Sequence, residues 1–201
     1  LLVNEGDVVQ HGAPLAEVKA CPEMKIVAPA SGTVVAIERG ARRVITSIVL
    51  DVDPAHREFE HGPMDAATIA AADADTVRSR LLAGGVWPLL RSKPMAKIAR
   101  PDRTPKAILV SGMETGPNQA NPEVLLSGQT DALQAGITAL GKLTSGSVYL
   151  TRGMSGGDIF NGLSGVEEVR FSGPHPAGDA ETQINFVCPV ADGQEVWFLT
   201  A

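Results

Sequence analysis

Several residue types and patterns are scarce in this sequence, and each absence excludes a class of protein. No run of Lys and Arg is longer than a pair such as Arg42-Arg43, and the net charge is −6, so we expect no nucleic-acid partner. Only two of the 201 residues are cysteines, Cys21 and Cys188, and no C-x-x-C occurs. The usual spacings for zinc and iron–sulfur ligation are therefore missing, and we expect two free thiols.

Long apolar segments are missing as well. No stretch approaches the roughly 18 consecutive apolar residues of a membrane-spanning helix, so we expect no transmembrane segment. The first residues, LLVNEGD, lack the basic start and the long apolar run of a signal peptide. They are typical of the end of a strand that enters a turn, and we therefore expect the chain to be a fragment that is incomplete at both ends.

Residues 1–55 have the pattern of a small β domain. Short apolar clusters alternate with turn-forming residues such as Gly6-Asp7 and Ser31-Gly32, which is typical of a sandwich or barrel of short strands. The two halves, EGDVVQHGAPLAEV and APASGTVVAIERG, have the turn-and-strand character of a biotinyl/lipoyl-like domain. We therefore predict a biotinyl/lipoyl-like β sandwich that is incomplete at its N-terminus.

The sequence changes character after this domain. Residues 56–66 are polar and contain proline, which predicts a linker. Residues 67–201 alternate apolar runs with helical patterns, which predicts βαβ units in a Rossmann-like, mainly parallel α/β sheet that is incomplete at its C-terminus. The predicted helices cover residues 73–85, 121–143 and, as a short one, 157–163. The predicted strands cover residues 106–112, 147–153, 167–173, 183–190 and 195–199.

Lys25 lies just before an Ala-Pro-x-x-Gly segment, and carrier domains for biotin and lipoate also pair a protruding lysine with such a segment. A carrier lysine must lie at the exposed tip of a hairpin, and a full strand must separate it from the Pro-x-x-Gly turn. Lys25 precedes Pro29 by only four positions (29 − 25), and residues 20–23, with their proline, suit the tip better. We therefore predict that Lys25 lies within the returning strand and is not modified.

Motifs for nucleotide binding and catalysis are absent. Neither G-x-G-x-x-G nor G-x-x-x-x-G-K-[ST] occurs. Residues 153–157 match G-x-S-x-G, but the only downstream histidine, His175, lies close by, and no convincing Asp…His order of a hydrolase follows. Segment 152–158 is open to two interpretations, a flexible connection or an unspecific phosphate site. His11, His56 and His61 lie in predicted turns, where we expect solvated surface groups. We therefore predict no catalytic residue, no cofactor-binding residue and no metal ligand.

Residues 172–178, Ser-Gly-Pro-His-Pro-Ala-Gly, form the most unusual local pattern. Prolines fix the backbone on both sides of His175, and nearby glycines allow unusual torsions. A rigid loop that presents one His at the end of a strand lies where α/β folds place ligands. The candidates for a ligand or partner loop are Gly173, Pro174, His175, Pro176 and Gly178. The alternative is a rigid turn with a solvent-facing His.

Five stretches together resemble the A subunit of the bacterial sodium-translocating NADH:quinone reductase: EGDVVQHGAPL, APASGTVVAIERGARRV, GGVWPLLRSKPMAKI, METGPNQANP and SGPHPAG. They occur in the order found in that family, and the resemblance covers essentially the whole chain. APASG is common to biotinyl-like domains, whereas its combination with WPLLRSKPMAKI and GPHPAG is specific. The family is related to the flavoprotein subunit of respiratory complex I, in which a glycine-rich loop holds FMN. In the corresponding residues 84–97, the bulky run Trp87-Pro88-Leu89-Leu90 replaces that loop. The resemblance thus implies that the chain binds neither FMN nor NADH tightly and has no redox cofactor of its own.

The resemblance also implies a place in a larger assembly. It implies an accessory subunit of the sodium-pumping NADH:ubiquinone oxidoreductase, one that is not catalytic alone. Such a subunit lies peripherally on the cytoplasmic face of the bacterial inner membrane, against the membrane-embedded subunits. Quinone binding and complex assembly stay open as its role, with ubiquinone as a ligand at the level of the complex. The alternatives are the C subunit of an Rnf-type complex, which needs cysteine clusters and an intact glycine-rich loop, and a biotin or lipoyl carrier fused to an enzyme domain.

Overall fold

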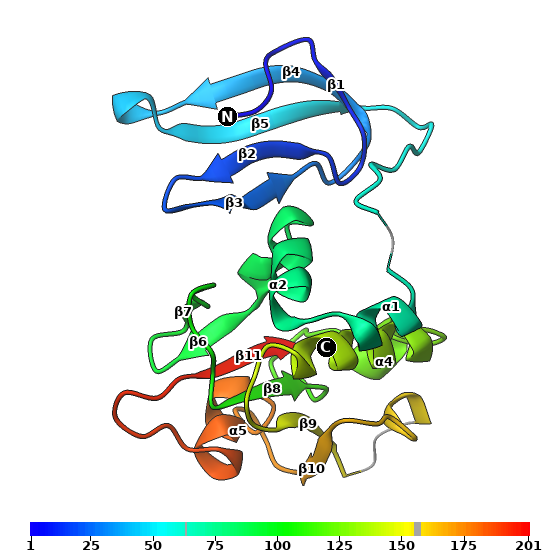
Figure 1. Ribbon diagram of the computed structural model, residues 1–201, viewed down its shortest axis with the longest axis vertical. Coiled ribbons are helices and arrows are strands. Elements are labelled where there is room, and N and C mark those ends of the chain that lie inside the picture. Colours follow the sequence, from blue (N-terminus) through cyan, green and yellow to red (C-terminus); the bar gives the residue numbers. More distant parts are fainter. Residues whose placement is uncertain (63, 155–157) are drawn as a thin grey trace. The chain divides into compact units, whose positions relative to one another are not determined.

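The computed structural model describes residues 1–62, 64–154 and 158–201. The chain divides into two compact units. The first contains Leu1–Pro63 and Ser79–Trp87, and the second contains Met64–Arg78 and Pro88–Ala201. The fold class predicted from the sequence is confirmed, because an all-β segment precedes an α/β segment (Figure 1).

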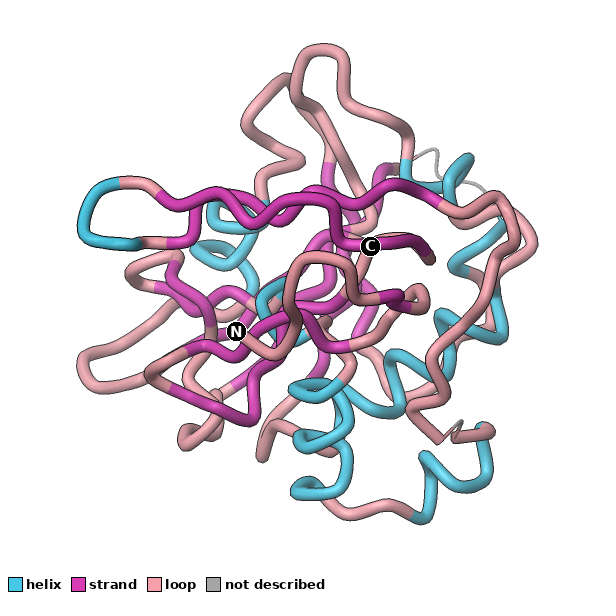
Figure 2. Tube along the Cα trace, turned by 90° about the horizontal axis from the view of Figure 1, so that it is seen from above, coloured by secondary structure: helices cyan, strands magenta, loops and turns pink. Residues whose placement is uncertain are grey.

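The first unit consists mainly of short antiparallel strands. One sheet contains β1 (Val8–Val9), β4 (Gly32–Arg39) and β5 (Ile45–Val52), and a second contains β2 (Pro14–Val18) and β3 (Cys21–Val27). A 3-10 turn, η1 (Ala41–Arg43), joins β4 to β5, and Figure 2 distinguishes such helical turns from the strands they join. The shared core contains Val3, Val9, Ala13, Leu15, Ala28 and Val34.

Ser31 and Gly32, from the APASG stretch, explain how this unit closes. A Cβ on Gly32 would lie 2.2 Å from the backbone oxygen of Asp51, so β4 and β5 approach as closely as they do only with glycine there. The buried Ser31 hydroxyl donates to the Arg57 carbonyl over 2.6 Å and accepts from the Arg57 N–H over 2.9 Å. Part of the segment 56–66 is therefore held against the β strands by specific hydrogen bonds.

Lys25 lies within β3, as predicted, and pairs in register with Glu17 on β2. Its Nζ lies 2.6 Å from Glu17 Oε1 and donates to the Pro22 carbonyl over 2.7 Å. The hairpin tip differs from the prediction, because the turn falls at Lys19 and Ala20 and β3 already begins at Cys21. The strand can start there because Cys21 pairs with the last residue of β2, Val18.

The second unit is built on a six-stranded sheet in the order β10-β9-β8-β11-β6-β7. The first four strands are mutually parallel, and β6 and β7 extend the sheet in antiparallel pairing. Their bounds are β6 Arg91–Lys93, β7 Lys97–Ile98, β8 Ala107–Ser111, β9 Val148–Gly153, β10 Glu167–Phe171 and β11 Val196–Thr200. The predicted mainly parallel sheet is thus confirmed.

Helices cover both faces of the central strand β8, every residue of which is buried. Leu109 packs in a core with Ile184 of α5 (Ala180–Val187), while Val110 lines an apolar cavity with Ile137 of α4 (Thr130–Gly141). Because successive strand residues point to opposite faces, α4 and α5 lie on opposite sides of the sheet. The remaining helical segments are α1 Ala66–Ala71, α2 Ala74–Ala83, η2 Trp87–Leu89, α3 Pro122–Leu125 and η3 Asp158–Phe160.

Three predictions for this unit need correction, and one feature was not predicted. Residues 183–190 are not a strand, because Asp179 caps a helix there by accepting from the Glu181 N–H over 3.0 Å. The helix predicted over 121–143 is two helices, α3 and α4, separated at Gly128, which has φ +78°. The short pair β6 and β7 was not predicted. The predicted helix over 157–163 is the 3-10 turn η3, and its first position, Gly157, falls outside the described residues.

Candidate functional site: the carboxyl edge of the parallel sheet

The chain order of the sheet creates a switch point beside β8. From β8 the chain proceeds outward to β9 and β10, and it then returns to place β11 on the other side of β8 (Figure 1). In open α/β sheets, ligands bind outside the carboxyl ends of the strands at such a point. The loops that follow β8, β9 and β10 all begin at this edge. Residues 112–121 and 172–178 are the first and last of these loops.

Loop 172–178 is fastened to the loop that follows β8. The Gly178 N–H donates to Thr115 Oγ1 over 2.9 Å, and His175 Nδ1 lies 3.5 Å from the same hydroxyl. The Ser111 hydroxyl, at the end of β8, lies 3.1 Å from the Met113 carbonyl and 3.4 Å from the Gly178 carbonyl. Two stretches of the sequence resemblance, METGPNQANP and SGPHPAG, therefore meet at one place.

The buried side chain of Gln183, on α5, is hydrogen-bonded to loop 172–178. The Thr151 hydroxyl donates to Gln183 Oε1 over 2.6 Å, and Gln183 Nε2 donates to the Ala177 carbonyl over 3.0 Å. Thr151 and Gln183 are both 0% exposed. A satisfied buried polar network of this kind rigidifies the backbone that it binds. The loop is therefore fixed at its C-terminal half, while residues 173–176 are exposed.

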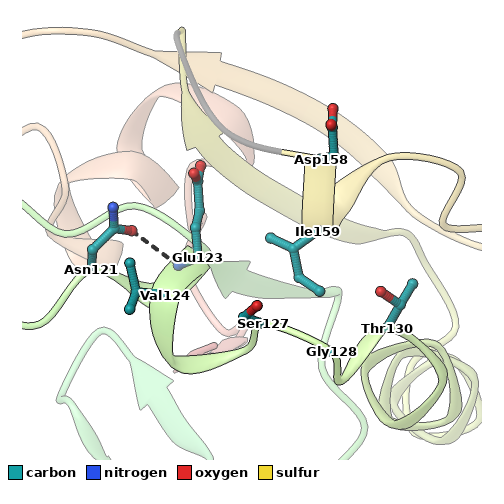
Figure 3. Close-up of a pocket in the computed structure, with 8 residues that line it drawn as sticks. All are labelled: Asn121, Glu123, Val124, Ser127, Gly128, Thr130, Asp158 and Ile159. Atoms are coloured by element: carbon teal, nitrogen blue, oxygen red, sulfur yellow. Dashed lines mark hydrogen bonds between the residues drawn. The ribbon is translucent and has the colours of Figure 1, made fainter.

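Two neighbouring cavities lie at the same edge. The larger has a volume of about 570 Å³ and is lined by Asn121, Glu123, Val124, Ser127, Gly128, Thr130, Asp158 and Ile159 (Figure 3). The smaller, of about 320 Å³, is lined by Gly112, Met113, Glu114, Gln119, Ala120, Asn121, Pro122, Glu123 and Gly153. Asn121 and Glu123 border both cavities, so the two cavities adjoin each other beside the Thr115 loop.

The charge of these cavities is negative. Their lining includes the carboxylates of Glu114, Glu123 and Asp158, and in the part of the chain that the structure describes it includes no Lys or Arg. Asn121 Oδ1 is occupied as the cap of α3, where it accepts from the Glu123 N–H over 2.9 Å (Figure 3). Acidic walls repel phosphate groups, so the edge is poorly suited to the phosphate of a flavin or a nicotinamide nucleotide.

Arg152, one residue before the end of β9, forms its contacts outside these cavities. It is 3% exposed, its Nε lies 3.1 Å from Glu168 Oε1, and its Nη2 donates to Asn161 Oδ1 over 3.0 Å. Burial opposes ionisation of Glu168, but its hydrogen bonds to Arg170 and Arg152 outweigh that effect and lower the pKa of Glu168. The guanidinium of Arg152 thus stabilises the pairing of β9 with β10.

The five predicted site residues lie in one loop but differ in burial. Gly173, Pro174, His175 and Pro176 are exposed, whereas Gly178 is buried beneath them. Ser155, from the G-x-S-x-G match, falls outside the described residues, as do positions 156 and 157. Sequence reasoning missed Thr115 and Gln183 as supports of the loop. The signal for Thr115 was its place in METGPNQANP, since the carboxyl ends of the parallel strands of one sheet share an edge.

The segment that corresponds to the FMN loop has a regular structure of its own. Residues 84–97 contain the 3-10 turn η2 and the strand β6, and positive φ occurs there at Gly85 and Ala96. Trp87 and Leu90 are buried at 0% and 3% exposed, whereas Leu89 is 66% exposed. Within the bulky run of residues 87–90, Trp87 and Leu90 therefore serve as core residues.

Comparison with known proteins decides the family. The family model described as the NqrA second alpha/beta domain matches residues 72–201, and the NqrA N-terminal barrel-sandwich hybrid domain matches residues 1–53. The chain belongs to the NqrA family. NqrA relatives are named as the A subunit of the Na(+)-translocating NADH-quinone reductase, and both matching models favour this family over the C subunit of an Rnf-type complex.

Curated NqrA proteins align along almost the whole chain. The sequence is 36% identical to the NqrA protein of Pasteurella multocida over 98% of the chain, and 40% identical to those of Pseudomonas aeruginosa and Klebsiella pneumoniae over 99%. The chain spans 44% of the length of each of these relatives. No helix among the described residues is both long enough and apolar enough to cross a bilayer.

Proposed function

We propose that this chain acts as part of the A subunit of a sodium-translocating NADH:quinone reductase, which lies peripherally on the cytoplasmic face of the membrane. Its α/β unit docks onto another component of the complex through the exposed loop 173–176. The observation that carries this proposal is the attachment of that loop to Thr115 and Gln183, which leaves His175 exposed on a fixed backbone. A surface that is fixed beforehand loses less conformational entropy when it binds.

The proposal includes the absence of a flavin bound by this chain. The acidic lining of the carboxyl edge supports it, because carboxylates repel a phosphate. The buried side chains of Trp87 and Leu90 support it as well, because they occupy the segment that corresponds to the flavin loop. We expect the purified chain to be colourless after expression in cells that contain flavin. A visible absorption spectrum with stoichiometric flavin would disprove this part of the proposal.

The docking role is tested with His175→Ala in the full-length protein within its complex. We expect the variant protein to be retained less well when the complex is purified, and NADH-driven quinone reduction to fall in proportion. His175→Gln should restore part of the retention, because an amide can still donate or accept a hydrogen bond. Asp192→Ala is the control, since Asp192 is exposed in the loop that leads into β11 at the opposite edge of the sheet.

A stability measurement separates docking from a purely structural role. The unfolding free energy of the isolated chain with His175→Ala should lie within about 0.5 kcal/mol of that of the parent. The reason is that the residue is exposed and its contact to Thr115 is long. A variant chain that melts far below the parent would show that His175 supports the fold. Normal retention of a stable variant would show that loop 172–178 is an ordinary turn.

Quinone binding is the second candidate, and an apolar cavity favours it. The cavity has a volume of about 380 Å³ and lies between α4 and the sheet, where its lining includes Val110, Leu133, Ile137 and Leu199. An almost entirely apolar lining suits a quinone ring or its isoprenoid chain. A photoreactive quinone analogue would then label α4 or β11 in the full-length protein. Leu133→Trp should reduce that labelling by filling the cavity, and labelling at other sites only would exclude this candidate.

A further inference from the structure

Two histidines and a glutamate from separate parts of the first unit meet at its surface. His11, His56 and Glu58 each offer one ligand atom, and these three atoms all lie within 4.8 Å of one another. The imidazole rings of His11 and His56 have centroids 5.1 Å apart, and His56 Nε2 lies 3.3 Å from Glu58 Oε1. The two histidines are 45 positions apart in the sequence (56 − 11), so only the fold brings these groups together.

The backbone that carries these groups is fixed. The His11 N–H donates to the Arg57 carbonyl over 2.9 Å, and the Phe59 N–H donates to the His11 carbonyl over 2.9 Å. These two bonds form a parallel bridge that pairs His11 with Glu58. Ser31, which is 3% exposed, binds Arg57 from beneath through both its N–H and its carbonyl. The backbone that carries the three ligand side chains is therefore held in place by hydrogen bonds.

Local charge also favours a cation at this place. In an extended segment alternate side chains share a face, so His56 and Glu58 point the same way and Arg57 points away from them. The Arg57 guanidinium lies 3.5 Å from the Asp53 carboxylate, so its charge is balanced by an acid outside the cluster. Glu58 supplies a negative charge beside the two imidazoles.

We propose that His11, His56 and Glu58 bind one zinc ion, with solvent in the fourth coordination position. Two imidazole nitrogens and one carboxylate oxygen are a donor set that suits Zn²⁺, and the absence of thiolate makes the site selective against soft ions. Tetrahedral zinc with nitrogen ligands at about 2.0–2.1 Å needs neighbouring ligand atoms about 3.4 Å apart. The His56–Glu58 pair already meets this spacing at 3.3 Å.

The ligand atoms would have to approach one another only slightly to reach zinc spacing, and this movement falls on exposed side chains. His56 and Glu58 have side-chain exposures of 63% and 73%, so rotation of their side chains can bring the ligand atoms closer without moving the backbone. A bound ion would then join residues 56–58 to the turn at His11. The ion would attach the segment after β5 to the β strands, in addition to the two backbone hydrogen bonds that already hold this segment.

Isothermal titration calorimetry of the untagged chain with Zn²⁺ tests the proposal. We expect one ion per chain, and at least about tenfold weaker binding for His56→Ala and for Glu58→Gln. The titration with Co²⁺ should give the strong visible absorption of a four-coordinate ion, and the same two variants should lose it. The matched control is His61→Ala, since His61 belongs to the same segment but its Nε2 lies 2.9 Å from the Gly12 carbonyl.

Thermal melting with and without Zn²⁺ gives an independent measurement. Zinc should raise the melting temperature of the parent and of His61→Ala, because the ion binds the folded state, and should leave that of His56→Ala unchanged. Both ligand variants should melt like the parent without metal, since the side chains of His56 and Glu58 are exposed. No binding by the parent, or equal binding by parent and both ligand variants, would overturn the site. Equal loss in His61→Ala would also overturn it, because binding would then depend on general histidine content.

Discussion

Gly178 and Thr115 come so close together that any side chain at position 178 would force backbone atoms to shift. A Cβ on Gly178 would lie 2.6 Å from the Thr115 backbone nitrogen and 2.9 Å from the carbonyl carbon of Glu114. The same approach lets the Gly178 N–H donate to Thr115 Oγ1 over 2.9 Å. The last glycine of GPHPAG therefore serves the contact between two loops, and the exposed residues before it depend on that contact for their position.

We predict that Gly178→Ala destabilises the α/β unit by about 1–3 kcal/mol, because the added methyl group meets backbone atoms that cannot rotate away. Urea unfolding monitored by tryptophan fluorescence measures the change. Gly136→Ala is the matched control, since nothing lies within 4 Å of its added Cβ in α4, and it should stabilise the protein by up to about 1 kcal/mol. Equal stability of Gly178→Ala and the parent would mean that the two loops are not held together in solution.

Asp179 determines where α5 begins, and its removal should be measurable. Asp179→Ala should cost about 1 kcal/mol of unfolding free energy, because the Glu181 N–H loses the side-chain acceptor that now lies 3.0 Å away. Asp179→Asn should cost much less, since an amide oxygen caps almost as well. Equal losses for the two substitutions would assign the effect to the charge of Asp179 and not to its capping bond. Urea unfolding of the three proteins distinguishes these outcomes.

The case of α5 shows where sequence reasoning reached its limit. The run QINFVCPV has the β-branched and aromatic residues of a strand, and from residues 183–190 alone a strand is the better interpretation. The helix starts at the cap at Asp179, which lies before this run, and the structure buries Ala180, Gln183 and Ile184 on the helix. Tertiary packing thus overrode local propensity. By contrast, β8 could be predicted because a short continuous apolar run is typical of a strand buried on both faces.

The site could be predicted only in part for a similar reason. Proline and glycine around His175 mark an unusual loop in any fold, so the sequence indicates it directly. Thr115 lies 60 positions before His175, and no local pattern connects the two residues. His11 and Glu58 pair across a comparable distance in sequence. Contacts between distant loops depend on strand order, which composition and periodicity do not specify.

The two cysteines should react at different rates, because their surroundings differ. Cys188 is 4% exposed, and burial raises the pKa of its thiol, which lowers the fraction of reactive thiolate at neutral pH. Cys21 is half-buried at the start of β3, so iodoacetamide should alkylate it first. Peptide mass spectrometry at timed intervals measures both rates. Unfolding in urea should equalise them, and faster alkylation of Cys188 in the native protein would contradict its buried position.

Lys25 should stay unmodified when the chain is co-expressed with biotin and lipoate ligases. The residue lies inside paired β3, opposite Glu17, and therefore cannot extend from a hairpin tip as a carrier lysine must. Its hydrogen bond to the exposed Glu17 lowers the pKa of that carboxyl, which is consistent with an ion pair along the strands. Glu17→Gln removes the ion pair but keeps the strand, so this variant should also stay unmodified. An authentic biotin acceptor domain in the same cells verifies that the ligase is active. A biotinyl or lipoyl mass increase on the Lys25 peptide of either protein would show that the register of the hairpin does not prevent modification.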